Sequence, residues 1–214
     1  MFTHYRTEGV VIKKIARGEA DLLLIVYTKE FGRVEVMARG ARKIASKLRP
    51  AIEFPAVIEI EFIQGKTCKT LTDAVIINLL GGIRDDLGKS VVLRQMGDFC
   101  ERVIKDQQED GRIWNLISSA FAFIGAAPSK GCEAVYHYFV WHLLEAAGWR
   151  PDLGEARPGG RPEFDPQAVK AEDLALVKFF RDSDIERSAR MKLASRQNNL
   201  LTETAEKYLA QVTG

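Results

Sequence analysis

The spacing of apolar residues changes partway along the chain, and this change constrains the fold more than any other feature. Up to about residue 78, apolar residues alternate with polar ones or form short β-branched runs; Ile58, Ile60 and Phe62 alternate with Glu59 and Glu61. A period of two is typical of half-buried strands. Beyond residue 88, apolar residues recur every three or four positions, as in amphipathic helices. The sequence therefore predicts an α+β, multi-domain chain in which a β-rich part precedes an all-α part.

Five short strands are predicted in the first part, at 9–14, 22–27, 33–38, 57–62 and 67–76. The links at 30–32 and 63–66 are tight, and the one long connection follows the third strand. Five strands with this spacing are typical of a small closed barrel, and an OB-fold is one such barrel. The spacing alone also fits an SH3-like barrel.

The second part is predicted to be a helical bundle with helices at 90–104, 113–124, 132–148, 171–182 and 198–212. The segment 132–148 is apolar nearly all round, which predicts a central buried helix that ends at Gly148. A Pro- and Gly-rich loop at 149–167 interrupts the bundle. We therefore expect two domains, a nucleic-acid-binding barrel at 1–79 and a helical domain at 80–214.

Positive charge is concentrated in the first part. Residues 1–78 hold 13 Lys and Arg against 9 Asp and Glu, whereas the remainder holds 18 against 20. Five cations and no acid lie in the segment 38–51, which fills the long connection of the expected barrel: Arg39, Arg42, Lys43, Lys47 and Arg49. Such a run is often only a solvated loop. On a barrel it could instead attract a phosphate backbone through counterion release.

Five further cations fall at other strand ends or loops, where a barrel could bring them to the same side: Lys13, Lys14, Arg17, Lys66 and Lys69. Together with the five cations of the loop, they form the predicted DNA-binding set. Tyr5, Tyr27, Phe54 and Phe62 could stack on bases, although a role in the core is the better interpretation for Tyr27 and Phe62.

No catalytic or cofactor motif is recognisable, so we expect no enzymatic activity, no cofactor and no metal. His137, His142 and Glu145 are spaced by five and three residues, unlike the HExxH zinc motif. The stretch Gly88-Lys89-Ser90 lacks the preceding glycine of a P-loop and is better read as a helix start capped by Ser90. Cys68, Cys100 and Cys132 form no CxxC pair, which favours buried thiols in a reducing cytoplasm. No signal peptide or membrane span is expected.

Several linked motifs resemble the opening of the RecO family of bacterial recombination mediators. They are Gly18-Glu19-Ala20-Asp21, Thr28-Lys29-Glu30-Phe31-Gly32, Gly40-Ala41-Arg42-Lys43 and Leu48-Arg49-Pro50-Ala51, in that order. The stretch LLEAAGWRPDL at 143–153 is similar to a later motif of the family. Many members carry a four-cysteine zinc site just beyond it, but here the segment GEARPGGRPEFDPQ contains no cysteine.

The resemblance implies an N-terminal OB-fold and a helical C-terminal domain in a cytoplasmic, nucleoid-associated protein. It also implies binding to single- and double-stranded DNA, annealing of complementary strands, and loading of the recombinase RecA onto strands coated by single-strand binding protein. The implied partners are RecR and the acidic C-terminal tail of that binding protein. Two alternatives remain from the residues: an adaptor that docks an acidic partner, and an RNA-binding barrel protein.

Overall fold

The computed structural model describes residues 3–53, 56–79, 83, 86–105, 108–126, 130–151, 153 and 171–213 of the 214-residue chain. Phe54 and nearly all of the 149–167 loop lie outside the described residues. The chain divides into two compact units, 1–127 and 128–214, which are taken one at a time below. The expected domain boundary between residues 79 and 80 falls where the strands end, and as a domain boundary it stays a prediction.

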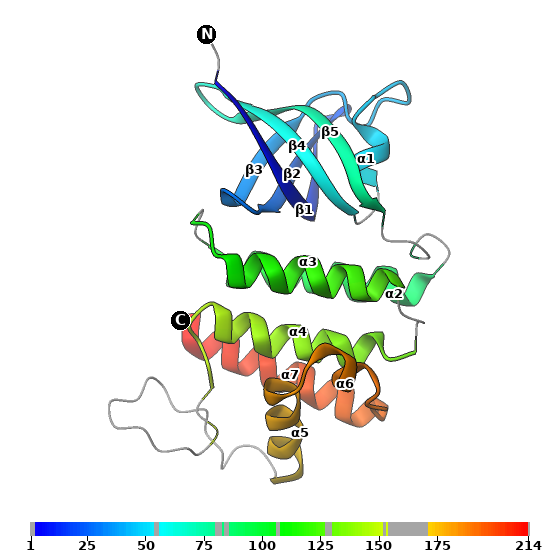
Figure 1. Ribbon diagram of the computed structural model, residues 1–214, viewed down its shortest axis with the longest axis vertical. Helices are drawn as coiled ribbons and strands as arrows, with labels where there is room; N and C mark the ends of the chain where they lie inside the picture. Colours follow the sequence, from blue (N-terminus) through cyan, green and yellow to red (C-terminus); the bar gives the residue numbers. More distant parts are fainter. Residues whose placement is uncertain are drawn as a thin grey trace. The chain divides into compact units, whose positions relative to one another are not determined.

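The first unit begins with five strands that close into a barrel in the order β1-β2-β3-β5-β4 (Figure 1). The strands are β1 (His4–Arg17), β2 (Asp21–Thr28), β3 (Gly32–Ala38), β4 (Ala56–Gln64) and β5 (Lys69–Leu79). The long β1 pairs with β4 through its first half and with β2 through its second half, and a short parallel pairing of β3 with β5 completes the ring. This is the OB-fold, so the fold expected for the first part is confirmed and the SH3-like alternative falls away.

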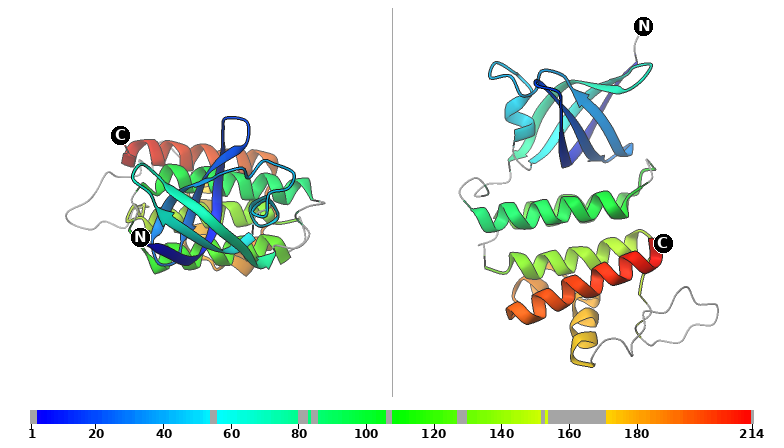
Figure 2. Two further views of the ribbon diagram at one scale, coloured as in Figure 1. Left: turned by 90° about the horizontal axis from the view of Figure 1, so that it is seen from above. Right: turned by 180° about the vertical axis from the view of Figure 1, so that it is seen from behind.

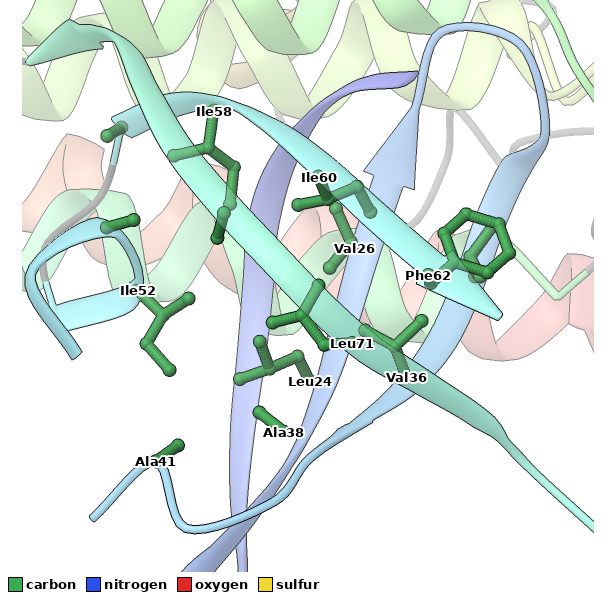
Figure 3. Close-up of a cluster of buried hydrophobic side chains, with 14 residues drawn as sticks. Leu24, Val26, Val36, Ala38, Ala41, Ile52, Ile58, Ile60, Phe62 and Leu71 are labelled. Atoms are coloured by element: carbon green, nitrogen blue, oxygen red, sulfur yellow. The ribbon is translucent and has the colours of Figure 1, made fainter. Parts of the chain in front are cut away.

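The barrel interior is filled by the alternating apolar residues that predicted the strands. Ile58, Ile60 and Phe62 of β4 meet Leu24 and Val26 of β2 in one buried cluster, and all five are at most 2% exposed (Figure 3). Ile52 joins this cluster from the short helix α1 (Arg49–Glu53), which lies in the connection between β3 and β4. Period-two sequences bury one face of each strand, and in a closed barrel those faces converge.

Strand β2 is buried on both faces. Ile25 and Tyr27 are at most 2% exposed but do not belong to the interior cluster. The Tyr27 hydroxyl donates to the backbone oxygen of Asp110 at 3.3 Å, just before helix α3 (Gly111–Ala126), and burial raises the pKa of Tyr27 to about 12. Helix α2 (Leu87–Val103) packs against β1. The predicted core role of Tyr27 and Phe62 is confirmed.

The second unit is a helical bundle built around α4 (Cys132–Ala146), as predicted. Ten of its residues are buried, including Trp141 and Phe139. Helices α5 (Ala171–Asp182), α6 (Ile185–Ala189) and α7 (Ser195–Thr213) contact it, and Gly148 ends it with a φ of 84°. None of the described helices combines the length and apolar composition that crossing a membrane requires.

Three details differ from the sequence-based expectations. Asp86, not Ser90, caps α2: its side chain accepts from the Lys89 amide, while the Ser90 hydroxyl donates to the backbone oxygen of Ile83. The five-residue helices α1 and α6 were not predicted, because one turn carries too few residues to show a period. Cys68 is only half buried, whereas Cys100 and Cys132 are buried as expected.

The contact between β1 and α2 depends on Gly97. A Cβ atom at this position would lie 2.2 Å from the Ile12 backbone oxygen, a distance no real contact tolerates. Replacing Gly97 with Ala is therefore expected to lower the free energy of unfolding by about 1–3 kcal/mol, measured by urea denaturation followed by circular dichroism. Gly111→Ala is the matched control, because its Cβ would meet open space. Equal stability of the two variants would contradict this close packing.

Candidate nucleic-acid interface

The loop that carries the basic segment is fixed to the β1–β2 hairpin by three hydrogen bonds. The Gly40 amide donates to Asp21 Oδ1 at 2.7 Å, and the Arg42 amide donates to the Ala20 oxygen at 2.9 Å. Arg42 Nη1 donates to the Gly18 oxygen at 2.9 Å. The motif 18–21 and the motif 40–43 are therefore the two halves of one contact, although they lie twenty residues apart.

Two glycines make this contact sterically possible. Gly18 at the hairpin tip has a φ of 59°, and Gly40 in the loop has a φ of 66°. Both values lie in the left-handed region, which costs a side-chain-bearing residue about 1–2 kcal/mol. Glycine at these positions lets the hairpin and the loop turn tightly enough to meet.

A pocket of about 380 Å³ opens where the hairpin strands, the loop and α1 come together. We call it the cationic pocket. It is lined by three basic side chains, Lys14, Arg42 and Arg49, and by three apolar ones, Leu22, Ala41 and Ile52. Lys14 Nζ donates to the backbone oxygen of Ile52 at 2.8 Å, which ties β1 to α1 at the pocket wall. The structure thus gathers predicted site residues from three elements.

The remaining cations of the loop lie close in sequence to the residues that line this pocket, and they are exposed to solvent. Arg39, Lys43 and Lys47 are exposed, and so is Arg17 at the end of β1. Within the described part of the chain, no carboxylate forms an ion pair with any of these four or with Arg42. Ile44, in the same loop, is 93% exposed. The loop therefore exposes its positive charge to solvent.

Lys13 lies elsewhere. It forms an ion pair with Glu101 of α2, and Asp98 lies 4.0 Å from the same Nζ atom. Consecutive residues of a strand point to opposite faces, so Lys13 faces the helix while Lys14 reaches the pocket. Because Lys13 is neutralised in this way, it stays outside the surface proposed below.

Lys66 and Lys69 belong to the β4–β5 hairpin. In the view from above, this hairpin lies away from α1 (Figure 2). Lys69 lines a second cavity, of about 340 Å³, together with the aromatic rings of Tyr5, Phe31 and Phe62 and the carboxylates Glu30 and Glu109. The ring of Tyr5 already stacks on Phe62, with centroids 5.3 Å apart and planes 18° apart. The carboxylates make this cavity less suited to a polyanion than the cationic pocket.

The motif at 28–32 forms the turn between β2 and β3 rather than a binding site. The Thr28 hydroxyl donates to the Gly32 oxygen at 2.8 Å and accepts from the Phe31 amide at 3.1 Å. Thr28 is fully buried, and Gly32 has a φ of 58°. These residues position β3 and hence the start of the basic loop.

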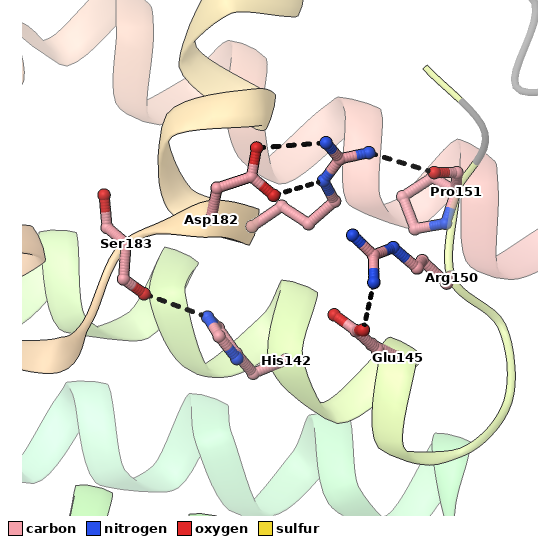
Figure 4. A network of polar contacts seen from close by, with 7 residues as sticks. His142, Glu145, Arg150, Pro151, Asp182 and Ser183 are labelled. Atoms are coloured by element: carbon pink, nitrogen blue, oxygen red, sulfur yellow. Dashed lines mark hydrogen bonds and ion pairs between the residues drawn. The ribbon is translucent and has the colours of Figure 1, made fainter. Parts of the chain in front are cut away.

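In the helical unit, the two histidines are structural. His137 Nε2 lies 2.6 Å from Asn198 Oδ1, and burial lowers the pKa of His137 to about 4. His142 Nε2 contacts the Ser183 oxygen at 3.2 Å, beside the Arg181–Asp182 and Arg150–Glu145 pairs (Figure 4), and burial lowers its pKa as well. Among the described residues, no three His, Cys, Asp or Glu side chains gather into a group that could hold a metal.

The fold and this surface define a class of protein: an OB-fold barrel with a cationic face, followed by helices. The sequence comparisons agree with this description. Residues 1–80 match the family described as recombination protein O, N-terminal. The resemblance to the RecO family stated from the motifs is therefore confirmed for this part of the chain.

The similarity to RecO proteins extends beyond the barrel. The chain is 26% identical to a DNA repair protein RecO from Gloeobacter violaceus and 28% identical to one from Roseiflexus sp., over 74% and 73% of its length. The aligned regions span only 60% and 54% of those two relatives. A RecO from Halalkalibacterium halodurans aligns over 98% of this chain and 90% of its own length at 22% identity.

The hydrogen bond from Gly40 to Asp21 is expected to hold the loop against proteases. In Asp21→Ala, loss of one charged hydrogen bond of roughly 1 kcal/mol should make tryptic cleavage within 39–47 about fivefold faster, measured by mass spectrometry of limited digests. Asp21→Asn should restore much of the protection, because its amide oxygen can accept the same hydrogen. Glu19→Ala, on the exposed neighbouring residue, is the control. An unchanged cleavage rate in Asp21→Ala would show that other contacts fix the loop.

Proposed function

We propose that this protein is a non-enzymatic, DNA-binding recombination mediator of the RecO type. The observation that carries the proposal is the cationic pocket on an OB barrel, beside three exposed loop cations, Arg39, Lys43 and Lys47, for which no ion pair is found among the described residues. The RecO match of residues 1–80 supports a role in recombinational DNA repair. The cytoplasmic, nucleoid-associated location implied by the resemblance belongs to the same proposal.

The binding mode that this surface supports is recognition of the phosphate backbone. Cations on a surface loop contact phosphates without reading base edges, so binding is largely independent of sequence. Both single and double strands carry the required phosphates. The surface that receives them comprises Lys14, Arg17, Arg39, Arg42, Lys43, Lys47 and Arg49.

Strand annealing follows from the same electrostatics. Two complementary strands repel each other as polyanions, and a protein that neutralises part of each backbone lowers that barrier without breaking a bond. No catalytic group is needed for such a step. Annealing and the loading of RecA onto coated strands are therefore compatible with a surface made of cations alone.

The proposed partners include RecR and the acidic tail of single-strand binding protein. The helical unit offers a cavity of about 470 Å³ whose lining combines apolar side chains with a positive charge, which suits a peptide with apolar and acidic side chains. Leu176, Phe179, Met191 and Leu200 line it, with Arg196 beside them. The Arg187 guanidinium lies 5.4 Å from the centre of the Phe179 ring and adds a second positive charge nearby.

The first test concerns the loop. The triple variant Arg39→Ala, Arg42→Ala, Lys43→Ala should bind single-stranded DNA more weakly and flatten the plot of log K against log salt by roughly 0.7 per lost contact, about 2 in all. Fluorescence anisotropy between 50 and 200 mM salt, roughly the range over which such slopes are resolved, measures both. The same variant should anneal strands coated with binding protein more slowly.

The control for this test is the triple variant Arg94→Ala, Lys105→Ala, Lys130→Ala, which removes three exposed cations outside the loop and changes the net charge equally. If both triple variants lower the slope to the same extent, the loop is not the DNA site. If an acidic peptide binds the wild-type protein and an oligonucleotide does not, the adaptor alternative replaces the proposal. Preference for an RNA strand over the same DNA strand would favour the RNA-binding alternative.

The second test concerns the tail. Arg196→Glu should weaken binding of a peptide of the binding-protein tail by about tenfold, because it turns an attraction at the cavity rim into a repulsion. Isothermal titration calorimetry measures the change. Lys207→Glu, at an exposed position of the same helix, is the matched control. An unchanged affinity in Arg196→Glu would remove this cavity from the proposal while leaving the DNA surface intact.

A further inference from the structure

The walls of the cationic pocket are of two kinds, and phosphate binding uses only one of them. The basic side chains Lys14, Arg42 and Arg49 suit an anion. The apolar side chains of Leu22, Ala41 and Ile52 add nothing to phosphate binding, yet they line the same pocket. A phosphate site needs no apolar wall, so this composition calls for a ligand with an apolar part as well as an anionic part.

We propose that the cationic pocket is a subsite for one unpaired nucleotide, which places its base against the apolar wall and its flanking phosphates on the basic side chains. This inference rests on the proposed function and adds the recognition of a base to it. A nucleotide combines a flat, weakly hydrated ring with an anionic backbone at fixed separation. The volume of about 380 Å³ leaves room for such a ring.

The positions of the basic groups favour this arrangement. Lys14 and Arg42 are anchored, because Lys14 Nζ donates to the Ile52 oxygen at 2.8 Å and Arg42 Nη1 donates to the Gly18 oxygen at 2.9 Å. Lys14 is bonded to the wall residue Ile52 itself, and Arg42 follows the wall residue Ala41 in the chain, so charge and wall are held close together. Anchored side chains lose little entropy when a ligand binds.

The apolar wall is supported from behind by the barrel core. Ile52 and Ala41, which are 1% and 2% exposed, belong to the buried cluster that fills the barrel (Figure 3). Leu22 packs against the same cluster and is only partly buried. Leu22 is therefore the wall residue that a base can contact, and the buried Ile52 and Ala41 support the wall from behind.

This subsite distinguishes an unpaired strand from a duplex. In a duplex each base is stacked and paired, and only an unpaired base can turn toward the protein at low cost. The cations hold either form of DNA, whereas the wall adds affinity for the single strand alone. A protein with this subsite would bind a single strand more tightly than the duplex that forms when the strand has paired.

The test compares two oligonucleotides of equal length and charge, oligo-dT and a strand of abasic tetrahydrofuran residues. The wild-type protein should bind the abasic strand about tenfold more weakly at equal salt, because the base no longer covers the apolar wall. The slope of log K against log salt should be the same for both strands. Fluorescence anisotropy supplies both quantities.

The variant Leu22→Asn locates the effect. It should lower the affinity for oligo-dT to nearly that for the abasic strand and leave the abasic affinity unchanged, which also shows that the variant is folded. Ile77→Asn, at a position that is 51% exposed on β5, is the control and should keep the full preference for bases.

The outcomes separate the two proposals. If the wild-type protein binds both strands equally, the base subsite is overturned and the DNA-binding proposal stands. If Leu22→Asn keeps the preference for bases, the base lies elsewhere and the subsite is likewise overturned. If an acidic peptide of the same charge displaces oligo-dT as well as unlabelled oligo-dT does, the pocket is a peptide site. If neither strand binds, the proposed function itself fails.

Discussion

The hydrogen bonds that join the basic loop to the β1–β2 hairpin are the interaction on which the candidate surface depends. A segment with five cations and no acid would otherwise favour extended conformations, because like charges repel one another. The Gly40–Asp21, Arg42–Ala20 and Arg42–Gly18 contacts oppose this repulsion. Each contributes about 0.5–1.5 kcal/mol, so three of them are enough to hold the loop in place. The carboxylate of Asp21 accepts a backbone N–H rather than a loop cation, and the positive charge stays available.

Much of the fold could be predicted from the sequence because its signals are local. Alternation in 57–62 predicts which residues of β4 face the core. Val92, Met96, Phe99 and Val103 recur every three or four residues, and this spacing predicts the buried face of α2. The length of β1 could not be predicted. It runs from His4 to Arg17, beyond the expected 9–14, because it pairs with β4 and then with β2, and both partners are set by the closed barrel. The cap at Asp86 was missed because a plausible Ser90 lay nearer to the apolar pattern.

The candidate site was predictable in composition but not in geometry. That the loop would gather five cations and no acid follows from its sequence. Lys14 joins these cations and Lys13 does not. The reason is a register shift between Val11 and Lys13, which decides on which face of β1 each side chain lies. Such an irregularity leaves no trace in the hydrophobic pattern.

The roles of Asp21 and Leu22 were also missed, although the motif 18–21 was recognised, because a motif does not show which distant segment it contacts. The contact between 18–21 and 40–43 is a feature of the tertiary structure, which the motifs alone do not show.

If the protein anneals DNA as proposed, binding strength and strand pairing need not conflict. A surface of a few phosphate contacts binds strongly at low salt and weakly as salt rises, since each contact releases counterions. A strand held this way can slide and shift its register while searching for its complement. The charges alone do not lower the affinity once the strands have paired, because a duplex carries more phosphates than a single strand. In the proposed base subsite, the apolar wall would add affinity only for an unpaired base. Formation of each base pair would then remove one source of affinity and favour release of the paired strands.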